Sequence, residues 1–331
     1  MLLTDNCVYE INLEVQDCEN IGPFNKRQEL FQFTNWELLH AIITCGMPIL
    51  RDMPGEIERR RYELLYKIFL VETALETDGR SLRKSDRVSY LDSTEKGTIS
   101  YYLGMFFTKL ISSKRFGVDL LTHFSLMQHS FGEEFFMFEG MKRPDMIGFR
   151  FADRTWSVWE AKGRTNNIQS TFDHGYAQAR EIAQINGRPP QMAAVCMTYY
   201  ENNFLTARIR DPEPEEGGLT LQWGQDLYYS AYYRQISQLF VGNNGEIRCR
   251  QDHSVLEDGV SIELPLIPIS GEEERISRRR EVKIGMQHQL TDLRPGMEER
   301  AGELFTKERH YGSVKDGRGY LGKDLVYIEG L

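Results

Sequence analysis

The stretch KRPDMIGFRFADRTWSVWEAKGR, residues 142–164, predicts two neighbouring apolar strands joined by a turn at residues 152–155. It also places Asp145, Glu160 and Lys162 within these strands. Charged side chains are costly where a strand faces a core, unless they are paired or bind a metal ion. This hairpin therefore predicts both the centre of the fold and a functional site.

The two-residue period of a strand places Glu160 and Lys162 on one face, roughly 6 to 7 Å apart along the backbone. Asp145 belongs to the partner strand and can reach that face if the register of the hairpin allows it. We expect the three charged groups to converge at one end of a sheet.

Two acids and a lysine in this arrangement predict a site for a hard divalent cation. Mg²⁺ prefers carboxylate, carbonyl and water oxygens, and the side chains of Asp145 and Glu160 with the carbonyl of Ala161 supply such ligands. The remaining coordination positions would stay open for water and phosphate. Lys162 could then orient the water, while the ion stabilises charge on the phosphorus oxygens. The expected cofactor is Mg²⁺, with Mn²⁺ able to replace it.

A long amphipathic helix is predicted before the hairpin. It begins after Asp92, because Asp92 and Glu95 match a capping box. A strand is expected near residues 118–124, between this helix and the hairpin. The apolar face of the helix is given by residues at 3.6-residue spacing, namely Ile99, Tyr102, Leu103, Phe106, Phe107, Leu110 and Ile111.

A second helix is predicted after the hairpin, between residues 173 and 186, with Gly187 as its C′ residue. MAAVCMTYY, residues 192–200, predicts a buried strand. From residue 92 onwards, the expected order is therefore helix, strand, strand, strand, helix, strand.

The flanking regions predict additions to this α/β core. Residues 1–90 are expected to be mainly helical after the opening strand CVYEINLEV, with helices around residues 30–45 and 56–76. Residues 91–212 form the predicted core. Residues 213–331 are predicted to be a mixed α+β region for substrate or partner recognition, with an acidic linker at 211–218, a tyrosine-rich helix near 225–240 and a strand near 260–267.

Composition excludes several classes of protein. Five widely scattered cysteines without CxxC spacing argue against a disulfide framework and a zinc site. The formal net charge of −9 lacks the basic footprint of a dedicated nucleic-acid binder, so such a function requires a locally basic groove, a partner or metal ions. MLLTDNCVYEINLE does not resemble a signal peptide, and no apolar run is long enough to cross a bilayer. We expect a cytoplasmic protein without a membrane partner.

Pro144-Asp145 and Glu160-Ala161-Lys162 resemble the signature of the PD-(D/E)XK, or restriction-endonuclease-like, nucleases. The order of elements is similar to the core of that superfamily, and the resemblance covers about a third of the chain. It implies a mixed sheet flanked by helices in the order αβββαβ, and metal-dependent hydrolysis of a nucleic-acid backbone, most often DNA.

By this resemblance Asp145 and Glu160 are metal ligands, and Lys162 is the base that positions water or a stabiliser of charge. Gln178, within QAREI, resembles an auxiliary glutamine that helps to place substrate or water in some branches. Some members add an acid from the preceding helix, for which Glu95 is the candidate, although Glu95 also fits a capping role.

The implied function is a DNA endonuclease of restriction, phage defence or DNA repair, acting as a homodimer or with an accessory protein. One alternative is a catalytically inactive module of the same fold that binds nucleic acid or a protein partner within a larger complex. Another is an unrelated α/β protein in which the three charges form a structural network.

Other polar residues receive structural interpretations. Arg164 is as readily a solvated arginine as a phosphate contact, and His123 and His129 lack a nucleophile pattern beside them. The basic runs 59–61 and 278–280 are interpreted as solvated faces. GRGYLGKD, residues 317–324, approaches a phosphate-binding loop but ends in an acid where a hydroxyl is required, so we predict no ATP site.

Overall fold

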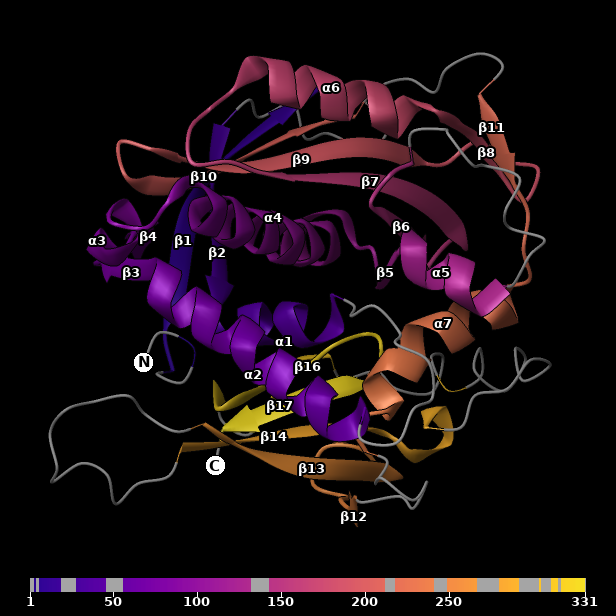
Figure 1. Cartoon of the computed structure of the whole chain (residues 1–331). Coiled ribbons are helices and arrows are strands. Elements are labelled where there is room, and N and C mark those ends of the chain that lie inside the picture. The colour runs from indigo at the N-terminus through magenta and orange to yellow at the C-terminus, as the bar shows by residue number, and fades with distance from the viewer. Residues whose placement is uncertain are drawn as a thin grey trace, which may run out of the picture.

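The computed structural model describes residues 3, 6–18, 28–45, 56–131, 143–211, 218–240, 249–266, 280–291, 304, 311–314 and 317–330. They form a mixed α/β fold with a curled mixed sheet flanked by helices (Figure 1). Among these residues, no helix combines the length and apolar character needed to cross a membrane.

The main sheet mixes parallel and antiparallel pairs, and β3 (Leu75–Asp78) joins it through β4. β7 pairs antiparallel with β6 and parallel with β9, while β10 pairs antiparallel with β9 and parallel with β1. Its path is β2 (Gln28–Thr34), β1 (Val8–Gln16), β4 (Ser81–Lys84), β10 (Phe204–Arg210), β9 (Met192–Glu201), β7 (Thr155–Gly163), β6 (Met146–Arg150) and β5 (Leu120–His123).

Two helices cover opposite faces of the sheet at β7 and β9. α4 (Ser93–Phe116) contacts both strands from one side, and α6 (Gln169–Arg180) contacts them from the other, as Figure 1 shows. The predicted order of helix, three strands, helix and strand is present as α4, β5, β6, β7, α6 and β9. Two short elements interrupt it, α5 (Phe124–Phe131) and β8 (Ile182–Ile185).

α4 begins where its sequence predicts. The Asp92 carboxylate accepts hydrogen bonds from the amides of Thr94 and Glu95, and the Glu95 carboxylate accepts one from the amide of Asp92. The capping box is thus confirmed. Gly117 ends the helix in the left-handed conformation, with φ of 68°, which a residue without Cβ adopts readily.

α4 lies directly on the backbone of β7. A Cβ built at Gly163 would stand 1.6 Å from the carbonyl oxygen of Ser100, and one at Gly104 would stand 2.8 Å from the amide nitrogen of Gly163. Side chains could not fit there, so the two glycines allow the helix to approach the strand closely. This contact determines how closely α4 approaches the end of β7.

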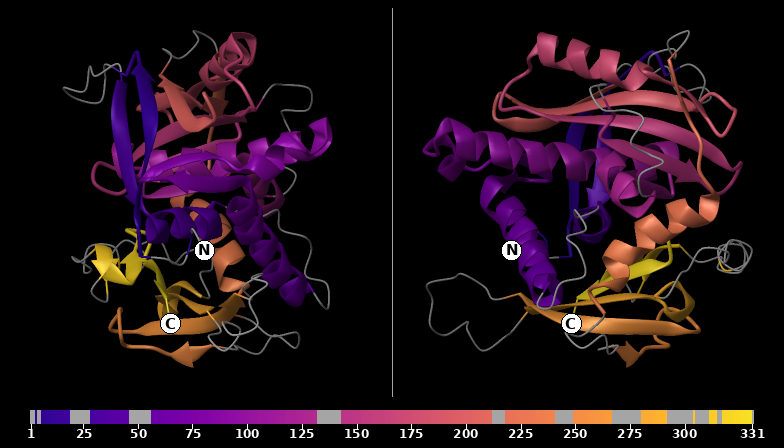
Figure 2. Two further views of the ribbon diagram at one scale, coloured as in Figure 1. Left: turned by 90° about the vertical axis from the view of Figure 1, so that its left-hand side faces the viewer. Right: turned by 45° about the vertical axis from the view of Figure 1, so that its right-hand side comes forward.

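The remaining described elements complete the chain. β8 pairs with β11 (Leu219–Leu221). A second sheet runs β12 (Arg250–Gln251), β13 (Gly259–Leu266), β14 (Arg280–Gln287), β17 (Val326–Gly330), β16 (Gly319–Leu321) and β15 (Gly312–Val314). Figures 1 and 2 show it below α1 and α7, on the far side from β7 and β9. The other helices are α1 (Asn35–Thr44), α2 (Glu56–Ala74), α3 (Asp86–Ser89), α7 (Gln225–Ser237) and the 3₁₀ turn His288–Leu290.

The N-terminal region contains more strands than the single opening strand that its sequence predicts. β1, β2, β3 and β4 lie within residues 1–90, and all four join the main sheet. The predicted helix around residues 30–45 begins only at Asn35, because Thr34 and Glu37 form a capping box there. The residues before it alternate between exposed and buried positions along β2, as a strand requires.

The helix predicted between residues 173 and 186 also has different bounds. α6 begins at Gln169 and ends at Arg180, and β8 follows. Asn186 and Gly187 have φ of 51° and 76°, and an antiparallel bridge joins Ile185 to Arg188 around them. Gly187 is therefore not a helix C′ residue, because the Asn-Gly pair forms a tight hairpin turn.

Several other predictions can be compared with the structure. The hairpin turn, the buried strand β9, the tyrosine-rich helix α7 and the strand β13 are confirmed. β10 was not predicted. Of the acidic linker, residues 212–217 lie outside the described residues. The buried Asp211 follows β10, and its side chain accepts a hydrogen bond of 2.8 Å from the amide of Ala193 in β9.

Candidate functional site

The β6–β7 hairpin brings the two predicted acids together. Its register pairs Met146 with Trp159, so the residue before β6, Asp145, lies beside Glu160. The amide of Asp145 donates a hydrogen bond of 3.0 Å to Oε2 of Glu160. In return, Oδ2 of Asp145 accepts one of 2.9 Å from the amide of Ala161. The two carboxyl groups therefore meet where β6 begins, beside the second half of β7.

Lys162 and Gln178 complete the cluster from the α6 side of the sheet. The ammonium group of Lys162 forms an ion pair with Oε1 of Glu160. It also donates a hydrogen bond of 3.0 Å to Oε1 of Gln178, whose amide nitrogen donates to the carbonyl of Arg143 at 3.5 Å. Because Lys162 lies two residues after Glu160, both side chains leave the same face of β7, as expected.

The environment of the cluster favours protonated carboxyl groups. Glu160 is only 1% exposed, and burial together with the nearby charge of Asp145 raises its pKa to about 8. Burial also raises the pKa of Asp145, although Lys162 opposes that shift. With both acids ionised the cluster carries a net charge of −1, because Lys162 offsets only one of the two carboxylates. A proton on Glu160 or a bound cation would offset the other.

This donor set fits a hard divalent cation. Two carboxylates at one point, with a lysine beside them, leave most of the coordination shell to water and phosphate, which suits Mg²⁺. No group of three His, Cys, Asp or Glu side chains suitable for a metal ion occurs in the described part of the chain. An ion bound at this site would have Asp145 and Glu160 as its side-chain ligands.

The sequence does not predict that Tyr101 lies near the two acids. Tyr101, in the third turn of α4, is half exposed, and burial together with the charge of Asp145 raises its pKa to about 12. Its hydroxyl therefore stays protonated in the physiological range. The linear sequence carries no signal for this proximity, since it arises from the packing of α4 against β7.

The remaining polar candidates have mainly structural partners. Glu95 is held in the capping box of α4, and Arg164 donates to the carbonyl of Gly163 and to the hydroxyl of Thr171, both at 3.2 Å. Burial lowers the pKa of His123 to about 4, so its imidazole is neutral at pH 7. The side chain of His129 lies outside the described residues.

The basic runs differ in what the structure describes. Arg60 is only 4% exposed, so the expectation of a solvated face for residues 59–61 is wrong at this position. Arg61 donates a hydrogen bond to the carbonyl of Leu239 at 3.2 Å. In the run at 278–280, residues 278 and 279 lie outside the described part of the chain.

The segment at residues 317–324, whose sequence approaches a phosphate-binding loop, forms strand structure instead of such a loop. β16 and β17 flank the buried Asp324, which accepts hydrogen bonds from the ring of His40 and the hydroxyl of Tyr232. The strand β17 follows this segment, at the position where a phosphate-binding loop requires a helix. The segment therefore joins the second sheet to α1 and α7.

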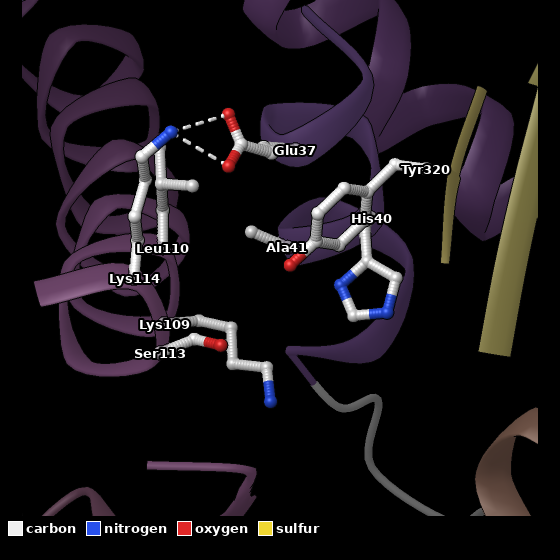
Figure 3. A pocket seen from close by; sticks show the side chains of 8 residues that line it. All are labelled: Glu37, His40, Ala41, Lys109, Leu110, Ser113, Lys114 and Tyr320. Carbon is white, nitrogen blue, oxygen red and sulfur yellow. Dashed lines mark hydrogen bonds and ion pairs between the residues drawn. The ribbon is translucent and has the colours of Figure 1, made fainter. Parts of the chain in front are cut away.

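Figure 3 shows a small cavity beside this junction, away from Asp145 and Glu160. Glu37, His40, Lys109, Lys114 and Tyr320 contribute to its lining, and Lys114 forms an ion pair with Glu37 at 2.7 Å across it. Its volume of about 10 Å³ suffices for one water molecule. It is too small for a substrate.

Comparisons of the chain with protein-family models, with curated proteins and with solved structures find no match.

Proposed function

We propose that this protein is a metal-dependent phosphodiesterase with a restriction-endonuclease-like core, acting on nucleic acid and most often on DNA. The observation that carries the proposal is the meeting of Asp145, Glu160 and Lys162 at the end of the β6–β7 hairpin, with Gln178 on Lys162. The order α4, β5, β6, β7, α6 and β9 supports the proposed core.

In this proposal Asp145 and Glu160 hold Mg²⁺ or Mn²⁺, with the carbonyl of Ala161 as a further ligand. The bound ion stabilises negative charge on the phosphorus oxygens and makes a coordinated water more acidic. Glu160 gives up its proton when it becomes a ligand, because a carboxyl group must be ionised to bind a metal. Lys162, oriented by Gln178, positions the attacking water and stabilises charge in the transition state.

Hydrolysis would then join the water oxygen to phosphorus as the water loses one proton. It would break the bond from phosphorus to the leaving oxygen of the nucleic-acid strand, which takes up a proton. A metal-dependent step also suits a chain of net charge −9, since the ion offsets repulsion between protein and phosphate. By resemblance alone, the biological role is DNA cleavage in restriction, phage defence or repair, in the cytoplasm.

The first test is hydrolysis of linear, circular and single-stranded DNA and of RNA in Mg²⁺ or Mn²⁺. We expect the wild type to cleave at least one substrate, Lys162→Ala to lose the activity, and Lys114→Ala to retain it, because Lys114 pairs with Glu37 far from the cluster. Equal cleavage by the wild type and Lys162→Ala would refute the proposal. Absence of cleavage by the wild type on every substrate would favour the inactive binding module.

A calorimetric titration tests the alternative of a purely structural charge network. Mn²⁺ added to the wild type should bind with about one ion per chain, and Asp145→Asn should weaken binding at least tenfold. A structural network would take up no Mn²⁺ in either protein.

A further inference from the structure

α6 passes closest to the candidate site at Gly175. This glycine is buried in the middle of the helix and faces the side chain of Lys162. A Cβ built on Gly175 would stand 3.2 Å from Cε and 3.3 Å from Cγ of Lys162, and 2.7 Å from Cγ2 of Val195. The stem of Lys162 thus lies in the space that a side chain at position 175 would fill.

Helix propensity does not account for this glycine. In a helix interior glycine is less favourable than alanine, since it loses more backbone entropy on folding. Its φ is not in the left-handed region, so no turn or cap requires it. The close contact with Lys162 and Val195 is the feature of the structure that excludes a larger residue.

The same helix also holds the far end of Lys162. Gln178 lies three residues after Gly175, so both positions share one face of α6. Because Gly175 has no side chain, the stem of Lys162 can pass close to the helix. Gln178 accepts a hydrogen bond of 3.0 Å from the ammonium group of this lysine. The ammonium group consequently stays within reach of Glu160 as well.

We propose that Gly175 is a positioning residue, which sets the path of Lys162 so that its ammonium group meets Glu160 and Gln178 together. The inference rests on the proposed function and adds to it a residue that touches neither substrate nor metal. A methyl group at position 175 would push the lysine stem away from α6 and break this alignment.

The experiment must separate this effect from damage to the fold. The methyl group of Gly175→Ala alone would contact Val195 as well as Lys162, and the contact with Val195 would lower stability independently of the lysine. The decisive variant is therefore Gly175→Ala combined with Val195→Ala. Removing the valine methyl groups relieves the 2.7 Å contact and leaves the contacts with Lys162. Val195→Ala alone and Gly97→Ala, a helical glycine with no heavy atom within 4 Å of its added Cβ, are the controls.

We expect the double variant to melt within a few degrees of Val195→Ala and to show kcat about tenfold lower at unchanged KM, the range found when supporting residues of a metal site are altered. Both controls should keep the wild-type kcat. A double variant with the kcat of Val195→Ala would overturn the inference.

A second readout does not depend on catalysis. Trace acetylation of lysines by acetic anhydride, followed by peptide mass spectrometry, measures how freely each ammonium group reacts. Held by Glu160 and Gln178, Lys162 should react slowly in the wild type and in both controls, and several-fold faster in the double variant. Unchanged reactivity in the double variant would overturn the inference, even if kcat had fallen.

The two proposals fail in different ways. If the wild type cleaves nothing, or cleaves as well as Lys162→Ala, the proposed function fails, and the acetylation pattern alone decides whether Gly175 positions Lys162. If the wild type cleaves and Lys162→Ala does not, a double variant with normal kcat and normal acetylation refutes the role of Gly175 only.

Discussion

Asp145 and Glu160 each accept a hydrogen bond from the backbone beside the other acid. The amide of Asp145 donates to Glu160 at 3.0 Å, and the amide that follows Glu160 donates to Asp145 at 2.9 Å. Each carboxyl group therefore has one oxygen hydrogen-bonded to a backbone amide and a second oxygen that can bind another partner. This exchange holds the two carboxyl groups side by side.

Metal binding should release a proton from this pair. Because burial and the charge of Asp145 raise the pKa of Glu160 to about 8, the carboxyl group is protonated at pH 7 without a metal. The affinity for Mn²⁺ should therefore rise about tenfold for each pH unit below about 8 and level off above it. Calorimetry at pH 7 in buffers of different ionisation enthalpy should show release of about one proton per ion. An affinity independent of pH between 6 and 8 would contradict this assignment.

The same pKa shift predicts how the stability of the metal-free protein depends on pH. A carboxyl group whose pKa is raised in the folded state contributes stability at low pH that is lost as pH rises, here between 4.5 and about 8. Glu160→Gln removes this dependence, so it should gain about 5 kcal/mol relative to the wild type over that range. Urea unfolding at several pH values measures the difference.

Asp153→Asn is the control with the opposite sign. Hydrogen bonding from Arg150 holds the pKa of Asp153 below its usual value, so its contribution to stability is lost as pH falls. If Glu160→Gln and the wild type show parallel stability curves from pH 4.5 to 8, the buried proton on Glu160 is absent.

Gln178→Ala should reduce kcat about tenfold, because Lys162 loses the acceptor that orients its ammonium group. Gln169→Ala, on the exposed first turn of the same helix, is the matched control and should leave kcat unchanged. Steady-state kinetics on the best substrate of the hydrolysis assay measures both variants. Equal rates for Gln178→Ala and Gln169→Ala would exclude a role for Gln178.

Gly163→Ala should destabilise the protein by at least about 3 kcal/mol, since the new methyl group would overlap the Ser100 carbonyl and force α4 away from β7. Gly97→Ala, in an open part of the same helix, should be neutral or stabilising by up to about 1 kcal/mol. Denaturant unfolding compares the two. A Gly163→Ala variant as stable as the wild type would show that α4 does not rest on this strand.

Asp324→Asn should cost about 3 kcal/mol at neutral pH, because it disturbs a buried charge network. Burial acts to raise the pKa of Asp324, but His40 and Lys109 outweigh it and lower the pKa below its usual value. This contribution is present at neutral pH and lost in acid, so the difference from the wild type should shrink as pH falls. Asp258→Asn, at an exposed pair with His288, should change stability by less than about 1 kcal/mol.

The sequence was most informative where the site residues belong to a single hairpin. Strand alternation fixes the shared face of Glu160 and Lys162, and the short turn sets the register that brings Asp145 beside them. The convergence of these side chains could thus be expected from local rules, whereas the place of Gln178 on α6 was implied only by the resemblance. Their catalytic and metal-binding roles remain proposals for the experiments above.

Other features depend on contacts between distant segments. The strand β2 pairs with β1 through partners such as Ile11 and Phe31, and β-propensity depends on such cross-strand neighbours more than on the strand itself. The end of α6 was misplaced because the Asn-Gly turn after β8 was not recognised as a competing signal. Gly175 could not be identified at all, because its constraint is the side chain of Lys162 on another element.

The parallel pairing of β1 with β10 has a consequence for synthesis of the chain. Arg208 and Gln16, joined by a side-chain hydrogen bond of 3.0 Å across this pair, are 192 residues apart. Before β10 has emerged from the ribosome, β1 pairs with β2 and meets the short β4 at one residue pair, Glu10 with Ser81. A two-stranded hairpin with so little added pairing is marginally stable in water. Protection of β1 from proteolysis in stalled nascent chains should therefore appear only once residue 210 has left the exit tunnel.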